Sequence, residues 1–298
     1  MVIDIMLPLA IEWNVDPVWF NIGSFPVRYY SLGFLFAFAC AYLILQRIFK
    51  REGVHTDYLD HLTIYVFLAT LGGARLGHCI FYQPDYFLTS EHWFEIFWPF
   101  HDGRFTGFEG LASHGAAIGI LLALWLFWRR FAMNVWWLLD RLVIVVALGG
   151  AFIRLGNLFN SEIYGHATTL PWGFIFVRDG ETQPKHPTQL YEALSYLAIF
   201  GGCLWYYLRK KARPRTGVIF GAWLIALWGV RLLIEFVKND QVDFEAGMTL
   251  NMGQLLSIPF ILAGGVILWL AHKDTFPQGP FPKGEKVKFE DKDKKKKK

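Results

Sequence analysis

The stretch "LLDRLVIVVALGGAFIRLGNLFNSEIYG" (residues 138–165) begins as an apolar helix and ends in charged and amide side chains. Its first part is long enough to cross a bilayer, because a membrane helix needs about 20 mostly apolar residues. Its last part places Arg154, Asn157, Asn160 and Glu162 about one helical turn apart. A charged group at bilayer depth costs on the order of 2.5–3.5 kcal/mol. The stretch therefore predicts a membrane helix that presents a polar site at one end.

The rest of the chain repeats this apolar pattern. Hydrophobic residues make up 54% of the 298 residues, against about 45–50% on a broader count in soluble domains. They gather in runs long enough to cross a hydrocarbon core about 30 Å thick. We therefore expect an all-α integral membrane protein whose residues 1–272 form a seven-span domain. The expected spans are residues 28–48, 61–82, 113–131, 138–157, 188–208, 216–237 and 252–271.

Lysine and arginine set the expected orientation, because positive charge near the ends of spans marks the cytoplasmic side. Of the 29 lysines and arginines, 20 fall in alternate loops and in the tail, five fall on the opposite side and four lie within spans. This predicts a periplasmic N-terminus and a cytoplasmic C-terminus. Residues 1–27 lack a basic n-region, so we do not expect a cleaved signal peptide.

Two long segments on the expected periplasmic side, residues 83–112 and 158–187, are rich in Trp, Phe, Pro and Gly, and predict a small periplasmic cap. "WFEIFWPFHDG" (93–103) is typical of an amphipathic segment at the membrane surface. "LPWGFIFVRDG" (170–180) predicts a short strand or hairpin. Interfacial aromatic belts are the alternative interpretation of both segments. The lysine-rich tail, residues 273–298, is predicted to be disordered; it either touches anionic lipids or stays solvated.

Polar residues gather in one predicted leaflet. Every expected span contributes to the outer half, whereas Asp140 and Arg141 in an inner half are an exception and are expected to pair locally. A shared outer cavity explains this clustering, and snorkelling of long side chains is the alternative. Glycine patterns such as "LGGARLG" (71–77) and "HGAAIG" (114–119) favour close helix packing. The outer polar residues are Tyr30, Arg75, His78, His114, Arg154, Asn157, Asn160, Glu162, His186, Gln189, Tyr191, Glu192, Arg231, Glu235, Lys238, Asn251 and Gln254.

A cavity that holds arginines, a histidine and carboxylates is suited to an anionic lipid head group. Arginine binds phosphate oxygens with a rigid fork of donors and stabilises a departing phosphate. A histidine near its ordinary pKa can accept a proton from a nucleophile. These residues predict a membrane protein that handles phospholipid, without naming the acceptor. No metal-ligand spacing is present, and no cofactor or nucleic-acid partner is predicted. The three cysteines fall within spans and predict no disulfide framework.

Other interpretations stay open at this point. A transporter would place ionisable groups near the bilayer midplane on broken helices, and a receptor or scaffold would need no reactive groups. Arg154 and Glu162 could form a purely structural pair, His114 could serve packing alone, and Tyr30 could belong to an aromatic belt. Arg75 and Glu192 are interpreted as structural.

Five motifs, in this order along the chain, resemble those of the bacterial prolipoprotein diacylglyceryl transferases. The resemblance covers nearly the whole chain apart from the tail and the first two dozen residues. The motifs are "SHGAAIG" (113–119), "GAFIRLGNLFNSEIYG" (150–165), "KHPTQLYE" (185–192), "VRLLIEF" (230–236) and "MGQLLSIP" (252–259).

The resemblance implies an enzyme of the bacterial inner membrane whose active site faces the periplasm. It implies transfer of the diacylglyceryl group from phosphatidylglycerol to the lipobox cysteine thiol of a prolipoprotein signal peptide. Membrane lipids are further expected partners. The products are a thioether and glycerol phosphate, and the reaction is the first step of lipoprotein maturation.

The resemblance also assigns residues. Two positions depart from the family pattern, because Lys238 stands where the family often has an arginine and Leu227 stands where it has a tyrosine. The implied catalytic residues are His114, Arg154, Arg231 and Glu162. The implied substrate-binding residues are Tyr30, Asn157, Gly165, His186, Glu235 and Lys238.

Overall fold

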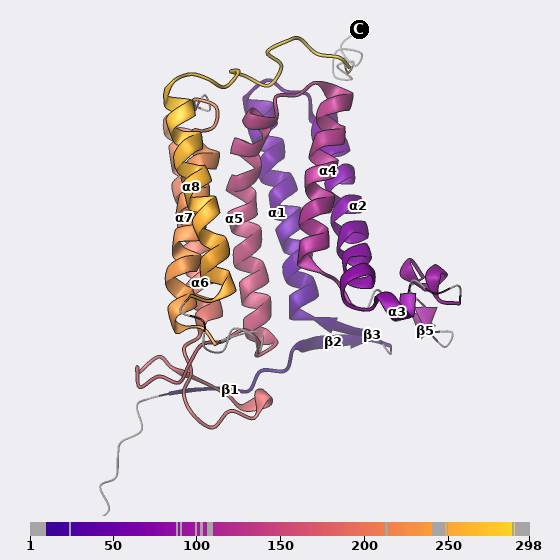
Figure 1. Cartoon of the computed structure of the whole chain (residues 1–298), viewed down its shortest axis with the longest axis vertical. Helices are drawn as coiled ribbons and strands as arrows, with labels where there is room; N and C mark the ends of the chain where they lie inside the picture. The colour runs from indigo at the N-terminus through magenta and orange to yellow at the C-terminus, as the bar shows by residue number, and fades with distance from the viewer. Residues whose placement is uncertain are drawn as a thin grey trace, which may run out of the picture. The chain divides into compact units, whose positions relative to one another are not determined.

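Long helices occupy every range in which the sequence predicts a span (Figure 1). The computed structural model describes residues 10–23, 25–87, 89, 91–98, 100–101, 104–105, 110–211, 214–239, 248, 250–287 and 289. Within these residues the long helices are α1 (Tyr29–Arg51), α2 (Thr56–Phe81), α4 (Ser113–Phe131), α5 (Val135–Phe159), α6 (Thr188–Arg209), α7 (Val218–Ile234) and α8 (Met252–His272).

Five of the described helical stretches are long and apolar enough to cross a membrane. They are α1, α2, α5, the stretch Val218–Val237 and α8. Helices α4 and α6 are not among these five: α4 starts with Ser-His and ends in two arginines, and α6 contains Gln, Glu and several tyrosines. The protein is therefore mostly helical and of the membrane class, as the sequence predicts.

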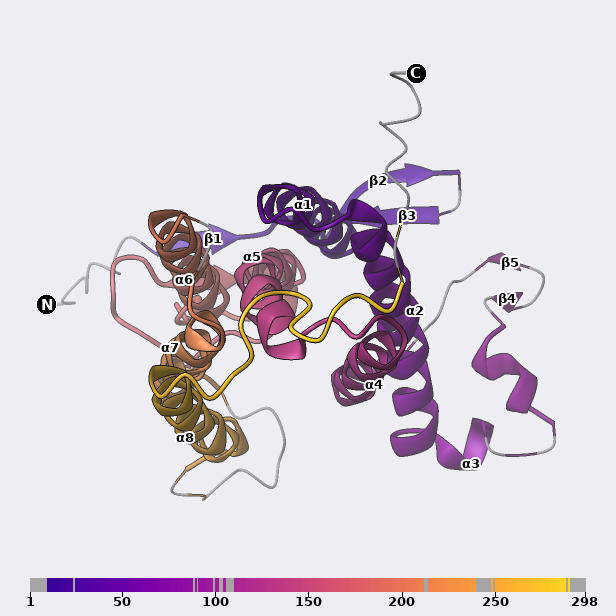
Figure 2. The ribbon, with the colours of Figure 1, turned by 90° about the horizontal axis from the view of Figure 1, so that it is seen from above.

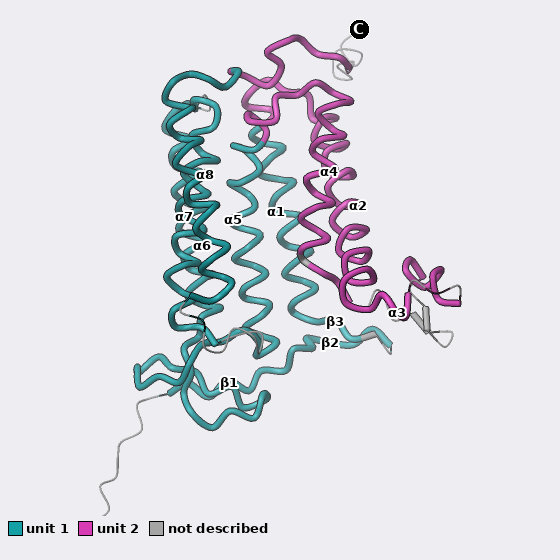
Figure 3. The backbone as a smooth tube through the Cα atoms, in the orientation of Figure 1, with its two compact units in different colours: residues 1–48, 139–277 teal, residues 49–138, 278–298 magenta. Residues whose placement is uncertain are grey.

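The chain forms two compact units (Figure 3). Unit 1 comprises residues 1–48 and 139–277, and unit 2 comprises residues 49–138 and 278–298.

In unit 2, helices α2 and α4 lie side by side along their glycines (Figure 2). A Cβ atom added to Gly73 would collide with the backbone of Gly115, and a Cβ atom added to Gly119 would collide with the backbone of Ala69. Small residues let helix backbones approach this closely. The predicted close packing of helices at these glycine patterns is therefore confirmed for α2 and α4.

A segment of short elements follows α2. It contains α3 (Pro84–Phe87), the 3₁₀ helix η1 (Trp93–Ile96) and the paired strands β4 (Phe100–His101) and β5 (Arg104–Phe105). Arg75 is buried, and its guanidinium donates to the carbonyls of Ile96 (2.8 Å) and Glu95 (3.1 Å) and lies 4.7 Å from the Phe87 ring centroid. Arg75 thus fastens η1 to α2, which is a structural role.

Tail residues 278–287 belong to unit 2 and contact other residues of that unit. The backbone amide of Asn134 donates to the carbonyl of Pro280 (2.7 Å), the Tyr58 ring packs on Phe281, and Lys286 donates to the carbonyl of Arg129 (3.2 Å). The prediction of a disordered tail covers residues 273–298, of which residues 288 and 290–298 lie outside the described residues.

In unit 1, helices α6, α7 and α8 run beside one another (Figure 1). The buried Asp140 carboxylate accepts hydrogen bonds from the backbone amides of Gly217 (2.7 Å) and Phe220 (2.8 Å), at the start of α7. Its Oδ2 lies 3.7 Å from Nη1 of Arg141. The predicted local pair is therefore present, and the carboxylate also caps the first turn of α7, where negative charge is favoured.

Short strands cover one end of the unit 1 helices. Strand β1 (Ile11–Trp13) pairs in parallel with β6 (Phe174–Phe176), which the 3₁₀ helix η2 (Val177–Asp179) follows. Strands β2 (Val18–Ile22) and β3 (Phe25–Arg28) form an antiparallel pair. The Trp13 indole donates to the carbonyl of Leu158 at the end of α5 (2.9 Å). The predicted strand at 170–180 is confirmed, and it packs where α5 ends.

Candidate active site

The polar end of α5 is held by a chain of hydrogen bonds. Nη1 of Arg154 donates to Oδ1 of Asn157 (3.4 Å), and Nδ2 of Asn157 donates to Oε1 of Glu162 (2.7 Å). Nδ2 of Asn160 donates to the same carboxylate oxygen (3.1 Å). The one-turn spacing in the sequence therefore becomes a connected network in which the carboxylate orients both amides.

Arg154 also pairs with α6. Its Nε lies 2.7 Å from Oε2 of Glu192, whose side chain is fully buried. The Tyr196 side chain, one turn further along α6, interacts electrostatically with Arg154 and with Arg231. Tyr196 is therefore a residue of unit 1 whose side chain interacts with both arginines.

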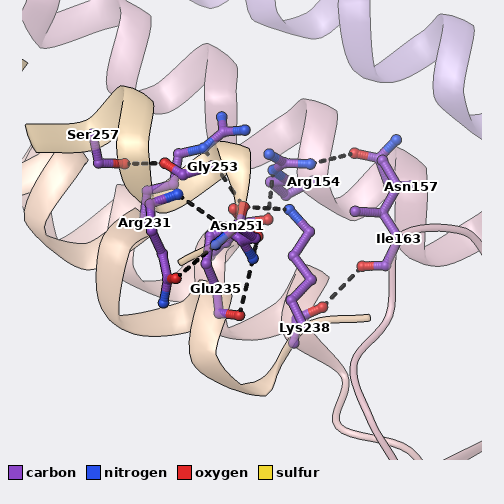
Figure 4. Close-up of polar contacts among 12 residues, drawn as sticks. Arg154, Asn157, Ile163, Arg231, Glu235, Lys238, Asn251, Gly253 and Ser257 are labelled. Atoms are coloured by element: carbon purple, nitrogen blue, oxygen red, sulfur yellow. Dashed lines mark hydrogen bonds and ion pairs between the residues drawn. The ribbon is translucent and has the colours of Figure 1, made fainter. Parts of the chain in front are cut away.

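A second cluster surrounds Glu235, the first residue of the 3₁₀ helix η3 (Glu235–Val237) after α7 (Figure 4). Its Oε1 accepts from Nζ of Lys238 (3.0 Å) and lies 3.7 Å from Nε of Arg231. Its Oε2 accepts from Nδ2 of Asn251 (3.2 Å), the residue that caps α8. A Cβ atom on Gly253 would collide with this carboxylate, so the start of α8 packs directly on Glu235.

The three cations differ in what they can offer to an incoming anion. Arg154 is matched by Glu192, and Lys238, whose side chain is 1% exposed, is matched by Glu235. Arg231 shares Glu235 at a longer distance, and 31% of its side chain is exposed. Arg231 is therefore the cation best placed to bind an anion, because it is the least engaged and the most accessible.

The departure at Lys238 has a clear structural setting. The Lys238 backbone forms an antiparallel bridge with Gly165. A Cβ atom on Gly165 would collide with the carbonyl oxygen of Val237 and with the side chains of His186 and Thr188. Only glycine fits at position 165, and its reason for being there is the close approach of the segment after α7.

Tyr30 lies over the end of α5. The Tyr30 ring packs where a Cβ atom on Gly156 would be, and the side chain interacts electrostatically with Glu162 and Arg154. The start of α1 is thereby joined to the α5 network.

His186, just before α6, forms a separate hydrogen-bonded chain. The Trp172 indole donates to the Tyr191 hydroxyl (2.9 Å), so that hydroxyl has its own proton to donate to Nδ1 of His186 (3.2 Å). Burial, followed by the nearby His166, lowers the pKa of His186. The ring therefore favours its neutral form, with Nδ1 as the acceptor.

Tyr164 contacts the segment that contains β6 and η2. Its ring stacks on Phe176, and its hydroxyl proton is shared between the carboxylates of Asp179 and Glu181. Burial and these hydrogen bonds to carboxylates raise its pKa, so Tyr164 stays a neutral donor. Its role is to hold the loop that carries η2.

His114 lies at the exposed start of α4, in unit 2. The arginine clusters lie in unit 1. The predicted meeting of His114 with Arg154 and Arg231 therefore stays a prediction.

Several residues of the network were missed from the sequence or assigned only structural roles. Glu192, which the sequence suggests is structural, forms an ion pair with Arg154, and its structural role stays a prediction. The motif "KHPTQLYE" supplied the signal for Thr188 and Gln189, which bind the turn after α5. Tyr196 had no sequence signal, because an aromatic residue in an apolar helix is ordinary. Among the described residues, no group of three or more His, Cys, Asp or Glu could hold a metal ion.

Comparisons with known proteins agree with one another. Residues 17–270 match the family model described as prolipoprotein diacylglyceryl transferase. The chain is 44% identical over 263 residues to a phosphatidylglycerol–prolipoprotein diacylglyceryl transferase of Tolumonas auensis, covering 88% of this chain and 98% of the relative. It is 43% identical to the Porphyromonas gingivalis protein of that name (91% and 98% covered) and 40% identical to the Bacteroides fragilis one (87% and 94%).

Proposed function

The chain belongs to the prolipoprotein diacylglyceryl transferase family, and from this premise we propose that it transfers the diacylglyceryl group of phosphatidylglycerol to prolipoproteins. The acceptor is the thiol of the lipobox cysteine. The observation that carries the proposal is the pair of arginines in unit 1, Arg154 and Arg231, each of which forms an ion pair with a buried carboxylate. In this arrangement the charges of the arginines are already balanced by carboxylates. An incoming phosphate can replace a carboxylate as the partner of an arginine.

The reaction is a displacement at carbon. The thiolate sulfur attacks the glyceryl carbon that bears the phosphate ester, the C–O bond to that ester oxygen breaks, and a C–S bond forms. The oxygen leaves with glycerol phosphate, and the thiol proton passes to a base. A thiol with a pKa of about 8.5 is mostly protonated at neutral pH, so a base and a positive field both favour the reaction.

Roles follow from these needs. Arg231 and Arg154 bind the phosphate and stabilise the charge that develops on it. Glu162 and Asn157 orient Arg154, and Glu235 orients Arg231 and Lys238. Tyr30, Gly165 and His186 form the surroundings in which the lipid head group binds, and His114 accepts the thiol proton.

The proposed topology is that predicted from the charges. Seven helices cross the inner membrane, the N-terminus and the cap lie in the periplasm, and the C-terminus lies in the cytoplasm. The mostly apolar composition of α4 and α6, flanked by basic residues at their predicted cytoplasmic ends, supports counting them as spans.

Transfer of label tests the function. Purified protein is mixed with phosphatidylglycerol labelled in its acyl chains and with a lipobox peptide. We expect labelled peptide with the cysteine form and none with a cysteine-to-serine peptide. No transfer to either peptide would contradict the proposal, and uptake of a solute into vesicles by the same protein would identify a transporter instead.

A further inference from the structure

The turn that follows α5, residues 160–165, has an unfavourable backbone conformation. Ser161 and Ile163 both have a left-handed conformation, with φ of 56° and 63°. This region is disfavoured for residues with a Cβ atom, and most strongly for β-branched ones such as isoleucine. Such conformations persist only where the surroundings hold them. Contacts around the turn must therefore stabilise this conformation, because the turn sequence itself does not favour it.

Two consecutive residues of α6 grip two consecutive carbonyls of this turn. Nε2 of Gln189 donates to the carbonyl of Glu162 (2.6 Å), and Oγ1 of Thr188 donates to the carbonyl of Ile163 (2.8 Å). Both α6 residues are fully buried. Buried hydrogen bonds are costly to lose, because the remaining partner stays desolvated.

The gripped turn carries the carboxylate that orders the α5 network. Glu162 accepts from Asn157, which in turn accepts from Arg154. A continuous path of hydrogen bonds thus runs from the first turn of α6 to a guanidinium of the site. A shift of the turn would move the Glu162 carboxylate and release Asn157 from its orientation.

We propose that Thr188 and Gln189 are positioning residues that hold the strained turn at 160–165 and, through Glu162 and Asn157, aim Arg154 at the lipid phosphate. The proposal deepens the proposed function and rests on it. Thr188 and Gln189 act on backbone carbonyls within the protein and need no contact with substrate.

The main test compares three variants in the labelled-lipid assay. Thr188→Val and Gln189→Met keep size while removing the donor, and Thr188→Ser keeps the hydroxyl. We expect the first two to raise KM for phosphatidylglycerol about tenfold, with KM for the peptide unchanged, and Thr188→Ser to stay within about twofold of wild type. A merely structural defect lowers the amount of active protein and leaves both KM values alone.

A matched control removes the same kind of bond elsewhere. Oγ1 of Thr63 donates to the carbonyl of Leu59 within α2 (2.8 Å). Thr63→Val is expected to leave both KM values at wild-type levels. Thermal unfolding in detergent shows whether each variant is folded, so that misfolding is separated from mispositioning.

Backbone strain offers a second, independent readout. Glycine adopts the left-handed region without penalty. Ile163→Gly therefore lowers the backbone strain that Thr188 and Gln189 must offset. We expect Ile163→Gly in the Thr188→Val background to recover at least half of the lost affinity for phosphatidylglycerol.

Three results would overturn the proposal: wild-type KM in both Thr188→Val and Gln189→Met, equal losses in Thr188→Ser and Thr188→Val, or no recovery with Ile163→Gly. Failure of the proposed function looks different, because the unmodified chain would then transfer no label. In that case, amide hydrogen exchange of residues 160–165 tests whether Thr188 and Gln189 hold the turn. Faster exchange in Thr188→Val than in Thr63→Val supports this positioning role, and equal exchange overturns it.

Discussion

At the scale of single residues, the site is a set of cations that already have partners. Arg154 is held by a fully buried Glu192, whereas Arg231 lies further from Glu235 and is partly exposed. Removing one partner of a buried ion pair leaves an uncompensated charge. The two arginines are therefore expected to differ in what their removal does to the fold, although we propose the same role in the reaction for both.

Arg231→Ala and Arg154→Ala separate these effects. Each is expected to reduce turnover at least about 100-fold, because each removes a donor to the departing phosphate. Arg154→Ala is also expected to lower the thermal stability clearly, since Glu192 stays buried without its cation. Turnover and thermal unfolding in detergent are measured for both. Near-normal turnover in either inserted variant would count against the phosphate-binding role.

His114→Gln tests the proposed base. Turnover at pH 7 should fall about 100-fold, which is typical for loss of a general base. The variant should regain part of this loss at pH 9, because the acceptor thiol then ionises without help. Rates over this pH range give the answer, and retention of most activity at pH 7 would remove His114 from the role.

His186 is expected to make the stability of the protein depend on pH. Its pKa is lowered in the native protein, so the unfolded chain, with an ordinary pKa of about 6.5, takes up the proton first as the pH falls. Stability should therefore be complete above about pH 6.5 and decline as the pH drops toward the native pKa. His186→Asn should reduce this decline in thermal unfolding between pH 7 and pH 5. An unchanged decline would assign it to other groups.

At the scale of elements, packing depends on where glycines face a neighbouring backbone. Gly73 of α2 lies against Gly115 of α4, whereas a Cβ atom on the adjacent Gly72 would meet nothing within 4 Å. The two positions are neighbours in sequence and opposite in their surroundings. The helix face, rather than the glycine content, decides the cost of a substitution.

Gly73→Ala is expected to destabilise the protein by about 1–3 kcal/mol, the usual range for overpacking. Gly72→Ala should be neutral or slightly stabilising, because alanine favours a helix over glycine. Thermal unfolding of the pair in the same detergent measures the difference. Equal losses for both variants would show that α2 and α4 do not pack through Gly73.

At the scale of the whole molecule, the predicted orientation assigns opposite sides to the two ends of the chain. Single cysteines at Asn21 and Lys283, in a chain with Cys40, Cys79 and Cys203 replaced, report on it. A membrane-impermeant maleimide should label Asn21→Cys in cells with a permeable outer membrane and Lys283→Cys only after the inner membrane is opened. The reverse pattern would contradict the topology.

The sequence alone predicted much of this protein. Runs of apolar residues located every long helix, because burial in hydrocarbon needs a length that composition reveals directly. The turn-spaced polar residues after residue 153 marked the site, and their order along the chain matched the family motifs. The strand near residue 174 was likewise visible from its composition.

Tertiary structure decided which charges meet. Glu192 forms an ion pair with Arg154, and the backbone of Lys238 pairs with Gly165, because residues far apart in the chain come together where α5 and α7 end and α6 begins. The left-handed backbone at Ile163 is likewise set by contacts with α6 rather than by local preference. Local sequence fixes helix length and polarity, whereas partner choice and strain depend on long-range packing that no single segment encodes.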